Sequence, residues 1–213
     1  MKGIAIVSTK GGVGKTSLSH LLALGAAWKN SPAYLMHTDE REPIRVQGRP
    51  YMYYDARDPE TLSRLIGAAI NQDGLCVIDS GGNRPEFDKW IASAVDMVVI
   101  PVTPDPEAVE MALEHMERLE GYGAENVRFI LNMVSSNRPE QLRDNSQYFS
   151  LLPKDKIIGE VSKVSAVKRL READKGNFET PPTNVNNLSR RLFVTIKSAL
   201  KDIEEKKEHL EIA

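Results

Sequence analysis

The residues with the clearest chemistry lie near the start of the chain, in the segment Lys10-Gly11-Gly12-Val13-Gly14-Lys15-Thr16. Its glycines let several backbone N–H groups converge closely on a phosphate. Lys15 supplies positive charge for the β- and γ-phosphates, and the Thr16 hydroxyl can ligate Mg²⁺. The pattern therefore predicts a loop that binds the phosphates of a nucleotide. The predicted nucleotide-binding residues of this segment are Lys10, Gly11, Gly12, Val13, Gly14, Lys15, Thr16 and Ser17.

This loop departs from the common form of the motif, G-x-x-x-x-G-K-[ST], at its first glycine. Counting back from Gly14, that glycine would stand where the chain has Thr9. A second lysine, Lys10, follows directly. A glycine-rich turn with a solvated lysine is the plainer alternative. The order of strand, loop, Lys-Thr pair and helix favours the phosphate-binding interpretation.

A strand and a helix must hold this loop in place. The apolar run Ile4-Ala5-Ile6-Val7 precedes it, and a helical stripe of leucines follows it. Similar apolar runs alternate with amphipathic stretches along the chain, as in parallel sheets with helices on both faces. The predicted strands are Gly3–Val7, Ala33–His37, Leu75–Asp79, Met97–Val102 and Val127–Met133, with a weaker one at Tyr51–Tyr54 and the start of another at Ile157-Ile158.

The same pattern predicts several helices. Asp58-Pro59 is a helix start, with a capping side chain and proline at the first helical position. Another helix is expected from Pro106 to Gly121, where the glycine can end it. A long C-terminal helix carries the apolar stripe Leu188, Leu192, Ile196, Leu200 and Ile203. We therefore expect an α/β fold, a doubly wound, mostly parallel sheet, as one P-loop NTPase domain over residues 1–213.

Two aspartates follow predicted strands and could complete a metal-assisted nucleotide site. Asp79 ends the strand Leu75–Asp79, at the sheet edge where open α/β folds bind ligands. Ser80-Gly81-Gly82 then gives the backbone the freedom that a switch segment needs beside a γ-phosphate. Asp39 follows the strand Ala33–His37. Either aspartate could instead be a turn-forming residue at the end of its strand.

The loop with two lysines resembles the deviant Walker A motif of the ParA/MinD family of ATPases, most of all short ParA-type partition ATPases. The resemblance implies that Lys10 reaches across a dimer interface to the nucleotide of the partner subunit. It implies catalytic roles for Lys10, Lys15 and Asp39, with Asp39 orienting the attacking water. It also implies ATP as the cofactor and Mg²⁺ held at Thr16, Asp39 and Asp79.

Two further stretches resemble the family and one departs from it. Val98–Pro106 resembles the strand and proline-rich turn that follow the Walker B segment. Phe129–Val134 resembles the strand whose asparagine, here Asn132, faces the adenine base. The segment His37–Arg41 departs, because the family often has D-x-D-P-Q there. Asp39 is kept, so we retain its role, while the rate of hydrolysis stays open.

Composition limits the classes of function. The 213 residues are 41% hydrophobic and 27% charged, as is ordinary for a globular protein, and the net charge of −2 gives no overall signal for nucleic acid. The single cysteine, Cys76, excludes an internal disulfide or a cysteine-based metal site within one chain, and we expect it in a buried strand. No apolar run approaches the roughly 20 residues that span a bilayer, and no signal peptide is recognisable. We therefore expect a cytoplasmic protein.

In the family, ATP-bound dimers bind DNA without sequence preference through basic residues of the C-terminal half. Here the stretch Lys154–Arg171 holds six basic and two acidic residues. If this stretch were a helix, four apolar residues would form its inward face: Val161, Val164, Val167 and Leu170. Its outer face would carry Lys168, Arg171 and Lys175. The predicted DNA-binding residues are Lys163, Lys168, Arg169 and Arg171, although a solvated charged face is the plainer alternative.

The resemblance favours a ParA-type ATPase that segregates DNA, such as a plasmid, or positions another cargo. It implies a homodimer on ATP binding, slow and partner-stimulated hydrolysis, nonspecific DNA and a centromere-binding ParB-type or other adaptor as partners, and nucleoid association in the ATP-bound form. A conjugation accessory ATPase and a small-substrate ATP-dependent enzyme remain alternatives. A MinD-like membrane-cycling protein is disfavoured, because acidic residues outnumber lysines from Lys201 onward and a membrane-binding helix should be basic.

Overall fold

Seven parallel strands form one sheet within the described part of the chain. The computed structural model describes residues 1–43, 46–69, 71–82, 85–171 and 176–212. The strands are β1 (Lys2–Ile6), β2 (Ala33–His37), β3 (Met52–Asp55), β4 (Leu75–Asp79), β5 (Met97–Val102), β6 (Val127–Val134) and β7 (Ile157–Ser162). They lie in the order β3-β2-β4-β1-β5-β6-β7, and every neighbouring pair is parallel. The predicted α/β fold is confirmed.

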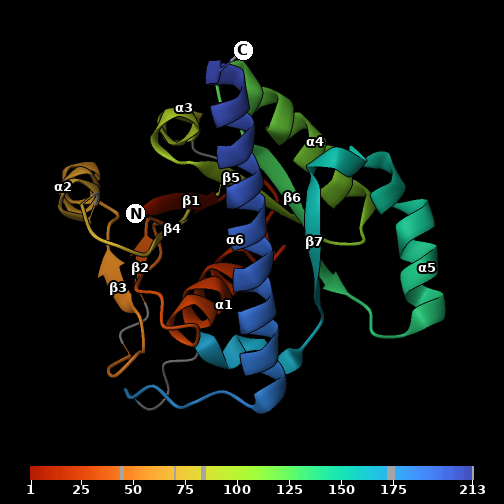
Figure 1. The fold of residues 1–213 in the computed structure, drawn as a ribbon. Helices are drawn as coiled ribbons and strands as arrows, with labels where there is room; N and C mark the ends of the chain where they lie inside the picture. Colours follow the sequence, from red (N-terminus) through yellow and green to blue (C-terminus); the bar gives the residue numbers. More distant parts are fainter. Residues whose placement is uncertain (44–45, 70, 83–84, 172–175, 213) are drawn as a thin grey trace.

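Helices cover both faces of the sheet, as the alternating sequence pattern predicts. They are α1 (Lys15–Ala27), α2 (Pro59–Ala69), α3 (Pro85–Ala94), α4 (Pro106–Gly121), α5 (Arg138–Gln147) and α6 (Thr183–Ile212), with short 3₁₀ turns η1 (Phe149–Leu151), η2 (Lys154–Lys156) and η3 (Ser165–Leu170). One hydrophobic cluster packs α1, α6 and η3 on one face, and a second packs α2, α3 and α4 on the other. Figure 1 shows α6 running across the front of the sheet, with α1 beside its lower half.

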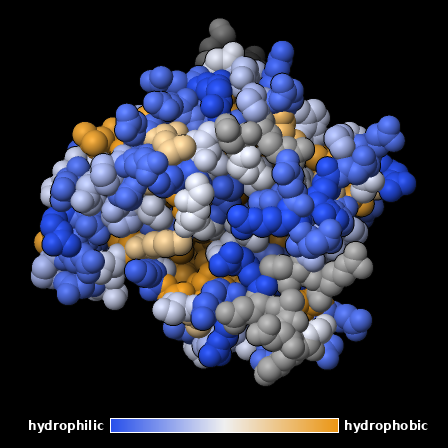
Figure 2. All heavy atoms as spheres, turned by 180° about the vertical axis from the view of Figure 1, so that it is seen from behind, coloured by the Kyte–Doolittle hydropathy of each residue, from blue (hydrophilic) through white to orange (hydrophobic). Residues whose placement is uncertain are grey.

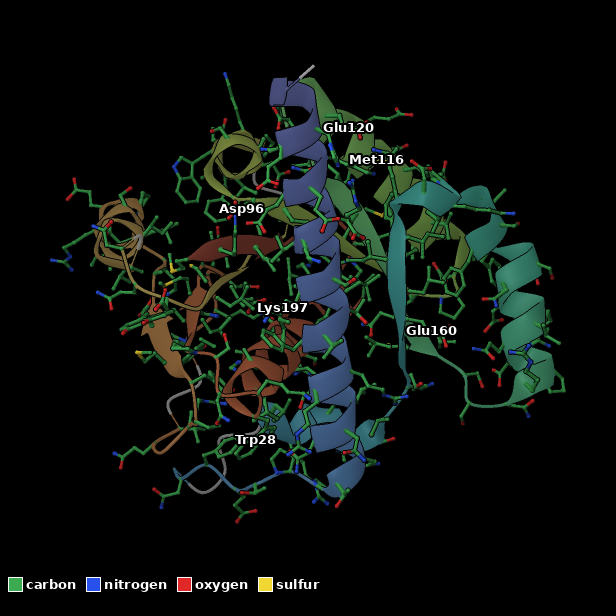
Figure 3. The ribbon with its side chains drawn as sticks, viewed as in Figure 1. Trp28, Asp96, Met116, Glu120, Glu160 and Lys197 are labelled. Carbon is green, nitrogen blue, oxygen red and sulfur yellow. The ribbon has the colours of Figure 1, made fainter. Side chains whose placement is uncertain are left out.

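α1 and α6 approach each other closely at Gly25. A Cβ on Gly25 would lie 2.0 Å from the carbonyl oxygen of Ser189, so only glycine fits there. Trp28, directly after α1, donates from Nε1 to Asn186 Oδ1 at 3.0 Å, and Figure 3 shows it beside the lower part of α6. The predicted apolar stripe of α6 is buried at every position, namely Leu188, Leu192, Ile196, Leu200 and Ile203. α6 thus fixes α1, and with it the loop in front of α1.

The stretch 161–171 differs from its predicted helix. Val161 belongs to β7 and pairs with Asn132 of β6, so that only Ser165–Leu170 turns, as η3. The β-branched residues of β7 fit a pleated strand, and this preference outweighed the helical spacing of the valines. The four side chains expected to face inward do pack on the core: Val161, Val164, Val167 and Leu170.

The sequence pattern indicates neither α3 nor α5. α5 offers no apolar stripe, since its one buried residue is Asp144, and its start is set by Asn137, whose side chain accepts from Glu140 N. α3 is tied to α4 by a buried carboxylate. Asp88 Oδ2 lies 2.9 Å from His115 Nε2 and accepts from Arg118 Nη2 at 3.0 Å. Local capping and a polar contact between distant segments leave no periodic signal.

Figure 2 shows the face behind the view of Figure 1, where hydrophilic residues cover most of the surface and hydrophobic ones lie in a hollow of its lower half. Within the described residues, no helix combines the length and the apolar character needed to cross a membrane.

The carboxyl ends of β1, β2 and β4 meet at one edge of the sheet, since Asp79 is in register with both Ile6 and His37. Open α/β sheets bind their ligands at this edge.

Candidate nucleotide-binding site

The loop Lys10–Lys15 leads from the end of β1 into the first turn of α1. Gly12 and Gly14 have φ angles of +80° and +91°, which favour glycine. Gly14 is the residue before α1, and its carbonyl accepts from Leu18 N at 2.9 Å. No side chain of the described residues caps this helix start. The first N–H groups of α1 are therefore left for an anion.

Asn132 braces the loop from β6. Its Nδ2 donates to the Val13 carbonyl at 2.7 Å, and a Cβ on Gly14 would lie 2.6 Å from the same nitrogen. The next residue, Met133, has a φ of +57°, at the point where the register between β6 and β7 shifts. Such local irregularities re-aim side chains near functional sites. Asn132 thus reaches the loop, and the contact that the structure gives it is to protein backbone.

The two lysines of the loop have different surroundings. Lys10 Nζ forms an ion pair with Glu107 in the first turn of α4, and its backbone N–H donates to Ser8 Oγ at 3.1 Å. Lys15 Nζ donates to the Lys10 carbonyl at 3.4 Å. Burial lowers the pKa of Lys15, against the opposing effect of Asp79 and Asp39. A partly desolvated ammonium that forms no ion pair with the described residues is suited to an incoming phosphate.

Asp79 is fully buried at the end of β4. Its Oδ1 accepts from Ser19 Oγ at 3.0 Å, and its Oδ2 lies 3.8 Å from His37 Nδ1. Its backbone carbonyl accepts from both Thr38 N and Thr38 Oγ1. Oδ2 has no hydrogen-bond partner among the described residues. A buried carboxylate oxygen without a donor fits a nearby cation, and the Thr16 hydroxyl at the start of α1 supplies a ligand of the type Mg²⁺ prefers.

Asp39 lies in a less enclosed setting, directly after β2. It is half-buried, and one of its carboxylate oxygens accepts from Arg41 N at 3.1 Å. The neighbouring His37 is buried, and its Nε2 lies 2.8 Å from the Arg41 carbonyl. Burial disfavours the charged form of His37, but Asp79 and the Arg41 carbonyl together raise its pKa above the ordinary value. His37 stands where the D-x-D-P-Q pattern described above has its first aspartate, and its ring lies next to Asp79.

The segment after β4 runs beside the phosphate loop. Ser80 N donates to the Ile6 carbonyl at 3.2 Å. A Cβ on Gly82 would lie 3.8 Å from Lys15 Nζ and 3.7 Å from the Ser8 carbonyl oxygen. A ligand that contacts Lys15 would therefore also be close to this segment, as the predicted switch role requires.

A cavity of about 410 Å³ adjoins the loop. Its apolar wall includes Leu18 and Leu21 of α1 and Val164 of the turn before η3. Ser17, Asn132 and Met133 line the side toward the loop. An apolar cavity with a few polar groups, next to a phosphate site, can hold the base and sugar of a nucleotide.

The four predicted DNA-binding residues, Lys163, Lys168, Arg169 and Arg171, are all exposed. Three of them, Lys163, Lys168 and Arg171, also line the cavity beside the loop. Arg169 lines a different cavity of about 280 Å³ together with Arg49. Lys175, expected on the same face, lies outside the described residues. The structure thus gathers these basic residues around η3, close to the candidate nucleotide site.

Several site residues are not apparent from the sequence. Glu107 holds Lys10, Ser19 holds Asp79, and Asn132 braces the loop in addition to any role toward a base. Ser19 lies one helical turn from Lys15, a spacing that could have indicated it. Cys76, by contrast, is buried in β4 as predicted, and burial raises its pKa to about 12.

No protein-family model and no curated protein matches the sequence. Solved structures do match. A protein from Borrelia burgdorferi assigned to plasmid partition and bound to AMPPNP is 19% identical with a TM-score of 0.66, and the match covers 97% of this chain and 99% of that one. A variant of Cyanothece McdA in complex with ATP is 16% identical with a TM-score of 0.67, over 94% and 96% of the two chains.

The MinD cell division protein of Aquifex aeolicus is 16% identical with a TM-score of 0.69, and the match covers 93% of this chain and 98% of that one. At these identities the likeness concerns the fold, and it extends over nearly the whole of each chain. The resemblance stated from the loop residues is thereby confirmed for the architecture around them. The chain has the fold of the ParA- and MinD-type ATPases.

Proposed function

We propose that this chain is a ParA-type ATPase that binds ATP with Mg²⁺, dimerises around the nucleotide, binds DNA without sequence preference and is reset by hydrolysis. The observation that carries the proposal is the preformed loop, with two positive φ glycines, an uncapped helix start and two lysines. Neighbours of the same fold were solved with AMPPNP, with ATP and, for MinD from Pyrococcus horikoshii, with Mg-ADP. These complexes support a nucleotide as the ligand.

In this proposal the residues of the site have separate roles in γ-phosphoryl transfer to water. The N–H groups of the loop and Lys15 bind the phosphates and stabilise their charge. Asp39 orients the attacking water, and its half-exposed position leaves access for that water. Thr16, Asp79 and Asp39 would hold Mg²⁺, which when bound neutralises phosphate charge. Asn132 keeps the Val13 carbonyl fixed so that the loop holds its shape.

Lys10 would leave Glu107 and reach the nucleotide of the partner subunit when two chains meet. Within one chain its ammonium is held by Glu107, a half-exposed pair that is cheap to break. Breaking this pair on dimerisation therefore costs little free energy. The contact that each nucleotide gains with Lys10 of the other subunit favours the dimer.

The exposed basic residues around η3 are the proposed DNA surface: Lys163, Lys168, Arg169 and Arg171. Lysine and arginine contacts to phosphates give affinity without sequence preference, and make it sensitive to salt. A ParB-type or other adaptor would stimulate hydrolysis, and the ATP-bound form would associate with the nucleoid in the cytoplasm.

One experiment tests the central steps. Light scattering after size exclusion, with and without ATP and Mg²⁺, should show a dimer only with nucleotide, most clearly for an Asp39→Ala variant. Random DNA should bind to that dimer and not to the Lys168→Glu plus Arg171→Glu variant. ATP binding, which should be kept, is measured in the same variant as a check, because both residues line the neighbouring cavity. A chain that stays monomeric with ATP would refute the dimer proposal. Loss of ATP binding in the double variant would assign these residues to the nucleotide instead.

A further inference from the structure

A buried serine of α1 contacts the carboxylate that ends β4. Ser19 has no exposed surface, and its Oγ lies 3.0 Å from Asp79 Oδ1. Asp79 is fully buried as well, and the two residues are 60 positions apart in the sequence. The contact therefore exists only because α1 packs against β4, and neither element makes it alone.

Ser19 has two acceptors for a single proton. Its Oγ lies 3.0 Å from the Lys15 carbonyl oxygen, one turn earlier in α1, and equally far from Asp79 Oδ1. A hydroxyl carries one hydrogen, so it donates to one of these acceptors at a time. Hydrogen bonds to an ionised acceptor are about twice as strong as those between neutral groups. The hydroxyl of Ser19 therefore donates to the carboxylate of Asp79.

The backbone of Asp79 is fixed independently of Ser19. Its carbonyl accepts from Thr38 N at 3.1 Å and from Thr38 Oγ1 at 3.0 Å. The following N–H, that of Ser80, donates to the Ile6 carbonyl at 3.2 Å. The freedom that is left to Asp79 is rotation of its side chain, and Ser19 restrains this rotation by holding Oδ1.

The other oxygen of Asp79 is left without a donor. Among the described residues, Oδ2 has no hydrogen-bond partner. His37 Nδ1 lies 3.8 Å from it, which is beyond the range of a hydrogen bond. A buried carboxylate oxygen in this state is costly unless a cation, or a water bound to a cation, lies beside it. The contact with Ser19 thus decides which oxygen of Asp79 stays available to such a cation.

We infer that Ser19 is a positioning residue for the metal: it holds Oδ1 of Asp79 so that Oδ2 stays available to Mg²⁺. This inference rests on the proposed function, because it requires that Mg²⁺ binds with the nucleotide. Residues that orient a metal-binding side chain contribute about 10–100-fold to metal affinity. The plainer role of a serine inside a helix is a bond to the preceding carbonyl, and that bond alone would leave the metal unaffected.

Nucleotide binding with and without Mg²⁺ tests this role. The affinity for a fluorescent, non-hydrolysable ATP analogue is measured by titration in Mg²⁺ and in EDTA. The ratio of the two affinities reports how strongly the metal and the nucleotide favour each other's binding. In Ser19→Ala this ratio should fall about tenfold relative to wild type. The affinity in EDTA should be unchanged, because the phosphate-binding loop keeps its donors.

Two further variants separate positioning from packing. Ser19→Thr keeps the hydroxyl and should restore the wild-type ratio. Ser189→Ala is the matched control, because Ser189 is also fully buried in a helix, but its Oγ donates to the Asn186 carbonyl of its own helix at 2.8 Å. This variant loses the same buried hydroxyl and should keep the wild-type ratio.

The outcomes distinguish the positioning role from the proposed function. A wild-type affinity that is equal in Mg²⁺ and in EDTA would contradict the proposed metal site, and the positioning role would fail with it. A metal-dependent wild type with the same ratio in Ser19→Ala would overturn the positioning role alone. An equal loss of affinity in Mg²⁺ and in EDTA would also overturn it, since damage to the packing of α1 does not depend on the metal.

Discussion

The phosphate-binding loop and the connection between β2 and β3 meet at the same sheet edge, but they are built in different ways. The loop is fixed at close range: Gly14 cannot carry a side chain, and the Val13 carbonyl is held by Asn132. In the connection, Asp39 is half-exposed and accepts one backbone hydrogen bond from its own turn, at Arg41 N. Other contacts of the connection lie at its start, from Thr38 to the Asp79 carbonyl, and further along, at Gln47 and Arg49.

This difference separates two parts of the proposed cycle. A rigid loop keeps its donors aimed at phosphates before the nucleotide arrives, so binding costs little reorganisation. A carboxylate held by one backbone hydrogen bond of its own turn, as in Asp39, can change its position when a γ-phosphate is present or absent. Binding should therefore withstand substitutions in the connection, whereas hydrolysis and signalling should not.

Asp39→Ala gives the largest expected effect on this comparison. Removing the group that orients the water should lower the rate of ATP hydrolysis by about 10²–10⁴-fold, with nucleotide affinity kept, because the loop is untouched. Steady-state phosphate release and fluorescence titration with a labelled nucleotide measure the two quantities. Glu40→Ala, at the exposed neighbouring residue, is the control and should hydrolyse ATP normally. Equal loss in both variants would contradict the assignment.

Gly14→Ala should break the other region. The φ of +91° strains alanine, and its Cβ would collide with Asn132, so the free energy of unfolding should fall by about 1–3 kcal/mol and nucleotide binding should be lost. Gly11→Ala is the matched control for stability, since a Cβ there meets no atom of the described chain within 4 Å. Denaturant unfolding and a nucleotide titration check both variants. Normal nucleotide binding by Gly14→Ala would show that the loop is not rigid.

His20 of α1, Tyr51 and Arg49 form a hydrogen-bonded cluster at the far end of the connection. We expect His20 to make the stability of the fold depend on pH. The pKa of His20 is lowered by burial in the folded chain and returns to about 6.5 on unfolding. The unfolded chain then binds the extra proton, so this contribution is present above about pH 6.5 and is lost as the pH falls through the folded pKa. Unfolding in denaturant between pH 7.5 and pH 5 should show wild type losing stability relative to His20→Gln.

The variant is needed because a second histidine acts in the opposite direction. His37 has a raised pKa, so its contribution is complete below its unfolded pKa and is lost as the pH rises through the folded value. Only the difference between wild type and His20→Gln isolates His20. Parallel curves for the two proteins would mean that His20 does not stay neutral in the fold.

The smallest expected effect concerns the ion pair between Lys10 and Glu107. Glu107→Gln should change the free energy of unfolding by less than about 1 kcal/mol, as for exposed pairs. It should strengthen ATP-dependent dimerisation by up to about fivefold, because Lys10 no longer has to leave a partner. Light scattering over a dilution series measures this, with Glu110→Gln as the control on the same helix. Weaker dimerisation in Glu107→Gln would indicate that Glu107 serves the dimer.

Much of the fold could be predicted because its signals are local. Apolar runs placed the strands, and Asp58 caps α2 through Thr61 N at 2.8 Å, as its position before Pro59 indicates. The sequence also predicted which side chains of residues 161–171 face the core. It did not predict their secondary structure, because spacing alone does not separate a short strand from a helix. α3 and α5 left no periodic signal, because α5 begins at the capping residue Asn137 and α3 is held to α4 by the buried carboxylate of Asp88.

For the site, the sequence alone predicted the phosphate-binding loop, since glycines, a lysine and a hydroxyl at fixed spacing are typical of such a loop. It also placed Asp39 and Asp79 at the ends of strands, because runs of apolar residues mark where the strands lie along the chain. Only the tertiary structure decided which side chains hold them: Glu107 for Lys10, Ser19 and His37 for Asp79, and Asn132 for Val13. Those contacts join residues up to 119 positions apart. The chain's folding, and no local pattern, brings such residues together.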